Sequence, residues 1–79
     1  MNFKKTTDDL FSAVSHDELA QAVGVSVATI RQARLDDEAK AHRSPPAGWE
    51  KAALKLAEAR ARHFDRLAGR LRAANSDGP

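Results

Sequence analysis

Arg31 and Gln32 are the two side chains of this sequence best suited to chemistry with a partner molecule. An arginine can form two hydrogen bonds to O6 and N7 of guanine, and a glutamine can do the same with N6 and N7 of adenine. Val27 and Ala28 lie one turn earlier, and small apolar side chains fit against the methyl group of thymine. The four residue types predict base contacts, provided that one helix presents them together.

Residues 16–23 are predicted to form a short helix that ends in a tight turn. Its apolar face consists of Leu19, Ala20 and Val23. Ser15 and Glu18 form a capping box at its start. Gly24 follows the last turn, where a helix end needs a residue that tolerates a left-handed backbone. Ala20 is the small residue that a second helix requires at a steep crossing.

The second helix of this pair is predicted from Val27 to Leu35, with Ser26 as its N-cap. Ile30 and Ala33 are its inward positions, and a rotation of about 100° per residue turns other positions outward. The outward residues are Ala28, Arg31, Gln32 and Leu35, with Val27 and Arg34 on one shoulder and Thr29 on the other. The pattern predicts a DNA-binding helix-turn-helix; the alternative is a plain helical hairpin without a DNA role.

Cations and hydroxyl groups around the predicted recognition helix are suited to the phosphate backbone. The predicted phosphate contacts are Ser26, Thr29, Arg34, Lys40 and Arg43. Arg43 is favoured because it lies in a basic loop that Pro45 and Pro46 stiffen. The acidic run at Asp36, Asp37 and Glu38 has no assigned DNA role and should point away from DNA.

A third helix is predicted before this pair, from about Asp8 to Val14, with Thr6 or Thr7 as its cap. Its apolar face consists of Leu10, Phe11 and Val14. Met1 to Lys5 are polar and expected to be loose. This helix should pack across the next two and complete a three-helix unit.

One long amphipathic helix is predicted from about Trp49 to Ala74. At 1.5 Å per residue it would reach about 39 Å, which is more than a chain of this size needs for one domain. Its apolar face predicts a homodimer interface: Trp49, Leu56, Phe64, Leu67 and Leu71. A flank of smaller residues runs beside that face: Leu54, Ala57, Ala61 and Ala68. The alternative is a helix that bends back on its own domain near Gly69.

The composition bounds what the chain can be. Its 79 residues predict one compact all-α domain, with a helix-turn-helix unit at 1–44 and a proline linker and dimerisation helix at 45–79. The formal net charge is +2, and the first 48 residues carry six basic against seven acidic side chains, so that half is not globally basic. There is no cysteine and no apolar run of signal-peptide or membrane-span length, which predicts a cytoplasmic protein.

The chemistry of other function classes is missing from the sequence. No serine, histidine and acid arrangement, phosphate-binding loop or metal-ligand spacing occurs. We therefore expect no enzymatic activity, no cofactor, no metal and no small-molecule ligand. A sequence-specific transcription repressor is the first function class, and a helical protein-interaction module, such as an adaptor or toxin-neutralising partner, is the second.

The stretch ELAQAVGVSVATIRQARL, followed by a basic Pro-Pro-Ala-Gly-Trp-Glu linker and an arginine-rich helix, resembles the small helix-turn-helix repressors of phages. In particular it resembles the anti-CRISPR-associated family. The resemblance implies a dimeric autorepressor that binds inverted repeats in the promoter of its own operon, in a bacterial host cell. The positions carried over are Arg31, Gln32 and Arg34 on the recognition helix and Arg43 in the following loop.

Overall fold

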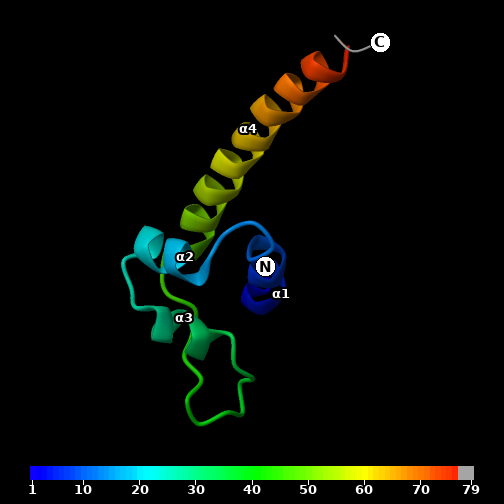
Figure 1. The fold of residues 1–79 in the computed structure, drawn as a ribbon. Coiled ribbons are helices and arrows are strands. Elements are labelled where there is room, and N and C mark those ends of the chain that lie inside the picture. The colour runs from blue at the N-terminus through cyan, green and yellow to red at the C-terminus, as the bar shows by residue number, and fades with distance from the viewer. Residues whose placement is uncertain (77–79) are drawn as a thin grey trace.

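The computed structural model describes residues 1–76, which fold into four helices without a strand. The helices are α1 (Phe3–Leu10), α2 (His16–Val23), α3 (Val27–Ala33) and α4 (Trp49–Ser76). The expected all-α class is confirmed for this part of the chain. The molecule is elongated, with principal extents of 60 × 20 × 20 Å, because α4 extends far beyond the three short helices (Figure 1).

The pair α2 and α3 begins and turns as the sequence predicts. The Ser15 hydroxyl accepts from the Glu18 amide and the Glu18 carboxylate accepts from the Ser15 amide, which completes the capping box. Gly24 adopts φ 87°, and its amide donates to Ala20 O at 2.8 Å. The Ser26 hydroxyl accepts from the Thr29 amide at the start of α3. Only the end of α3 differs, because the helix stops at Ala33 instead of Leu35.

The prediction for α1 is wrong in its position. The helix begins at Phe3, five residues early, because the Asn2 side chain caps it by accepting from the Lys5 amide at 2.9 Å. Phe3 is buried and anchors the segment that was expected to be loose. Thr7 is a fully buried residue inside the helix, and its hydroxyl donates to Phe3 O at 2.7 Å. The helix ends at Leu10, so Val14 is buried outside it.

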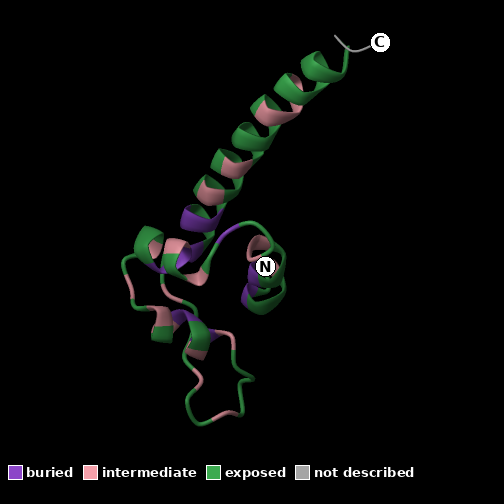
Figure 2. Cartoon of the chain, in the orientation of Figure 1, coloured by how far each residue is buried: buried purple, intermediate pink, exposed green. Residues whose placement is uncertain are grey.

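The hydrophobic core joins the N-terminal segment to all three later helices. The buried cluster consists of Phe3, Leu19, Ala20, Ile30, Ala33, Trp49, Ala52 and Ala53. The edge of the Phe3 ring packs on Trp49, with the ring centroids 4.8 Å apart. Figure 2 shows that burial on α4 is confined to its first turns, next to α1 and α2. The inward positions of α2 and α3 are confirmed, and α1, α2, α3 and the base of α4 form one head.

The rest of α4 projects from the head as a continuous helix (Figure 1). It runs through Gly69 to Ser76 without bending back on the domain, and so it is two residues longer than predicted. The predicted C-terminal unit, 45–79, ends in three residues that lie outside the described ones. Within residues 1–76, no helix combines the length and the apolarity that a membrane span requires.

Candidate nucleic-acid interface

The outer face of α3 carries the side chains that the sequence assigned to base contact. Ala28 and Arg31 are exposed and Gln32 is half-buried, so all three reach the surface. Val27 differs, because its side chain is half-buried and packs against the core cluster. Val27 is therefore less available for base contact than the other three residues, and its role in base contact stays a prediction.

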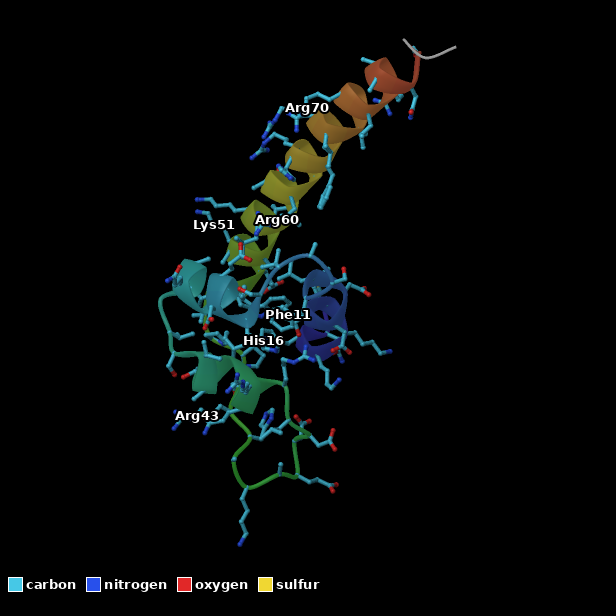
Figure 3. All side chains as sticks on the ribbon, in the orientation of Figure 1. Phe11, His16, Arg43, Lys51, Arg60 and Arg70 are labelled. Carbon is cyan, nitrogen blue, oxygen red and sulfur yellow. The ribbon has the colours of Figure 1, made fainter. Side chains whose placement is uncertain are left out.

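The connector after α3 returns to that helix instead of leaving it. The Arg43 amide donates to Gln32 O at 3.2 Å, which fixes the loop at the C-terminal end of α3. Two tight turns shorten the path, through Ala39 N to Asp36 O and His42 N to Ala39 O. The Arg43 side chain is exposed, and Figure 3 shows it at the edge of the head beside α3. Arg31 and Arg43 thus lie on the same part of the surface, although eleven residues separate Gln32 from Arg43.

The acidic run lies on another side of the connector. Asp36 and Asp37 line a groove of about 470 Å³ together with Asn2 and Lys4 of the α1 segment. His42 holds the run there, because its Nδ1 contacts Leu35 O at 2.9 Å and its Nε2 lies 3.4 Å from Asp37 Oδ1. Asp36 and Asp37 therefore lie in the part of the connector that neighbours the α1 segment.

Arg34 is the clearest correction to the predicted phosphate contacts. Its guanidinium is turned toward α1, where it donates to Asp8 Oδ1 at 2.5 Å and to the Thr7 hydroxyl. The same guanidinium lies 5.1 Å from the centroid of the Phe11 ring. These contacts occupy the side chain within the head. The sequence contains the signal for this placement, because Arg34 follows the buried Ile30 by four residues and so shares its side of α3.

His16 starts α2 close to the positive charges of α3. Its ring stacks on Phe11, with centroids 3.9 Å apart (Figure 3). Burial lowers the pKa of His16, and the charges of Arg34 and Arg31 lower it further. The imidazole is therefore neutral at neutral pH. Its ring packs flat against Phe11, in the segment that joins α1 to α2. Sequence reasoning had assigned Phe11 to the core but did not find this stack.

The remaining predicted phosphate contacts fall into two kinds. The hydroxyls of Ser26 and Thr29 are 3.0 Å apart and hydrogen bonded to each other, so both take part in the N-cap of α3. Lys40 is exposed in the middle of the connector.

The described residues contain no group of three or more histidine, cysteine or acidic side chains that could hold a metal ion.

The predicted dimer face is divided by the structure. Trp49 is buried in the core of its own head, and Leu56 packs half-buried against that core. The expectation that Trp49 meets a second subunit is wrong, since the core of its own head buries this side chain. Leu56 keeps part of its surface accessible in a shallow groove beside α2, so its place in a dimer interface stays a prediction. Phe64 and Leu71 are exposed and Leu67 is half-buried on the projecting part of α4.

Comparison of the chain with protein-family models, curated proteins and solved structures found no match. The resemblance to phage repressors stays a prediction from the residues.

Proposed function

We propose that this chain is a sequence-specific DNA-binding transcription repressor that acts as a homodimer on an inverted-repeat operator. The observation that supports it most is the arrangement of α2, the left-handed Gly24 and α3, with Arg31 exposed on α3 and Arg43 fastened beside it. A short exposed helix of this kind fits the major groove, which is wide enough for an α-helix. In its narrower form, the proposal is an autorepressor of its own anti-CRISPR operon in a phage.

The proposed division of labour follows the contacts of each side chain. Ala28, Arg31 and Gln32 read base edges, because they reach the surface from one helix face. Arg43 and Lys40 hold phosphates from the connector, because their side chains are exposed and the connector is pinned to α3. Phosphate contacts set the position of a protein on DNA, whereas base contacts set the sequence preference.

The first experiment is a gel shift with the DNA directly upstream of the chain's own reading frame, against a scrambled duplex of equal length. Arg31→Ala should cost about 1–3 kcal/mol on the operator and little on scrambled DNA. Arg43→Ala should weaken both duplexes alike and reduce the slope of log affinity against log salt by about one unit. Arg66→Ala, an exposed arginine on α4, is the matched control.

Two outcomes would contradict this function. An equal loss of affinity for both duplexes in Arg31→Ala would contradict a base-reading role for this residue. Wild-type protein that binds neither duplex would contradict DNA binding altogether. The second candidate function, a helical interaction module, is favoured by the exposed apolar side chains of α4, such as Phe64 and Leu71. This second function predicts that changes at Phe64 and Leu71 abolish binding to a partner protein, whereas Arg31→Ala has no effect on that binding.

A further inference from the structure

A row of side chains, all apolar except Asn75, follows the projecting part of α4 on a different face from the one that covers the core. Its spacing alternates between three and four residues: Leu54, Ala57, Ala61, Phe64, Ala68, Leu71 and Asn75. We call these seven positions the seam. Its large apolar members are exposed, with 58% of Leu54, 53% of Phe64 and 55% of Leu71 accessible. A repeat of 3.5 residues is the pattern with which one α-helix packs along another.

The seam continues into a groove at the base of α4. This groove has a volume of about 530 Å³ and lies between α1 and α4, lined among others by Leu10, Trp49, Leu54 and Ala57. The surface available to a second helix therefore runs without a break from the head to the end of α4. The alanines at positions 57, 61 and 68 allow close approach of another backbone.

We infer that the seam pairs with the seam of a second copy of this chain, in parallel and in register, as a short two-stranded coiled coil. The inference deepens the proposed function by naming its partner surface, and the orientation rests partly on that function. In register, every large side chain meets its equivalent and every alanine meets an alanine. Asn75 then faces Asn75 of the second copy, and a single asparagine at such a position is a known determinant of register in parallel pairs.

The charged residues beside the seam favour the parallel orientation. Arg60 lies on one flank and Asp65 on the other, and a parallel pair brings Arg60 next to Asp65 of the second copy. Arg60 already donates from Nε to Ala13 O at 3.1 Å and from one terminal nitrogen to Glu18. Its other terminal nitrogen has donors left for a carboxylate. An antiparallel pair centred on the seam would instead place Asp65 beside Asp65 and Asn75 against Leu54.

The position of α3 gives the third argument, which depends on DNA binding. Figure 1 shows α3 and its connector at the end of the molecule opposite the tip of α4. A parallel pair places both α3 helices at the same end, as adjacent half-sites about 34–36 Å apart require. An antiparallel pair would place them at opposite ends of an assembly built from protomers that are each 60 Å long.

The absence of cysteine from the sequence allows a direct test by disulfide formation. The variants are Ala61→Cys and Ala68→Cys, seven residues apart on the seam, with Ala59→Cys on the opposite side of α4 as the matched control. A disulfide requires Cα atoms roughly 4.4–6.8 Å apart, which a parallel pair provides at both seam positions. Under mild oxidation of the full chain, both seam variants should become covalent dimers on a non-reducing gel, and Ala59→Cys should run as a single chain without a cross-link.

The outcomes separate the parts of the inference. If the two seam variants cross-link only with each other when mixed, the parallel orientation is wrong. If neither cross-links and the wild-type chain sediments as a monomer, the pairing itself is wrong. The assay contains no DNA, so a chain that cross-links at both positions but binds no duplex would refute the proposed function and leave the pairing in place.

A second pair of variants tests the seam without a disulfide. Phe64→Glu combined with Leu71→Glu should convert the dimer to a monomer in sedimentation, because two carboxylates would be buried at the contact. Ala59→Glu combined with Arg66→Glu places the same groups on the opposite side and should leave the dimer intact. The fluorescence of Trp49, the single tryptophan, reports whether the head remains folded. A dimer that survives the seam variant overturns the inference.

Discussion

Trp49 and Phe64 are both aromatic residues on α4, but Trp49 is 7% exposed and Phe64 is 53% exposed. The difference comes from their neighbours rather than from the helix. Phe3 packs edge-on against Trp49, and the small residues Ala52 and Ala53 bring the base of α4 close to the other helices. Phe64 lies beyond the head, and within residues 1–76 its one aromatic neighbour is His63 of the same helix, at a centroid distance of 5.1 Å.

The two parts of α4 therefore obtain their stability from different sources. The base is held by burial within one chain, which does not depend on protein concentration. Apart from the contacts of Arg60 with Ala13 and Glu18, the projecting part is held by its own backbone hydrogen bonds, and a second molecule could add to its stability by burying its apolar side chains. The apolar content of a helix therefore does not show which of its residues face the core of the same chain. Four variants or conditions test this difference between covered and uncovered side chains.

The largest expected effect is on the head. Ile30→Ala should lower the free energy of unfolding by about 2–5 kcal/mol, because it removes a fully buried side chain from the core. Leu71→Ala, on the projecting part, should change it by no more than about 0.5 kcal/mol at protein concentrations where the chain is monomeric. Urea denaturation followed by Trp49 fluorescence measures both. Equal losses would show that Leu71 is packed as firmly within one chain as Ile30 is in the head.

Arg31 in α3 and Arg34, the residue directly after that helix, give the next contrast. Arg34→Ala should cost about 1.5–3 kcal/mol of stability, because it removes charge-assisted hydrogen bonds to Asp8 and Thr7. Arg31→Ala should leave stability within about 0.5 kcal/mol, since its side chain is exposed. Thermal denaturation of both variants checks this. A larger loss for Arg31→Ala would mean that its side chain supports the head.

A smaller effect is expected at the start of α3. Ser26→Ala should cost about 1 kcal/mol, because the Thr29 amide loses its cap acceptor. Ser44→Ala, in the exposed connector, is the control and should have no measurable effect. The midpoint of urea unfolding measures the difference in stability between the two variants. Equal midpoints would show that a water molecule replaces the Ser26 hydroxyl as the acceptor of the Thr29 amide without loss of stability.

The smallest effect concerns pH. The Ser15 amide and then Arg60 lower the pKa of Glu18, and Arg34 and then Lys4 lower that of Asp8. Both carboxylates thus hold their protons less tightly in the folded state, so their contribution is complete above the unfolded pKa values and declines as the pH falls through the lowered ones. Asp8 is exposed and Glu18 is only partly buried, so the solvent screens both interactions and the decline should be shallow. Unfolding curves from neutral into acid solution measure it, and Glu18→Gln should make the decline shallower still.

The sequence determined the α2–turn–α3 unit almost completely. The capping box at Ser15 and Glu18, the left-handed Gly24 and the cap at Ser26 act between residues at most four positions apart. Local hydrogen bonds of this range can be predicted from residue types and spacing alone. The same holds for the length of α4, whose pattern repeats over many turns.

Only the tertiary structure decided which side chains remained free for a partner. Arg34 is directed to α1 by Asp8, which is 26 residues distant in sequence, and Arg43 is returned to α3 by the carbonyl of Gln32. Trp49 is removed from the predicted interface because Phe3, in the first helix of the chain, packs against it. These contacts join segments whose separation along the chain leaves no periodic signal, so the free energy of packing, and not local propensity, selects them.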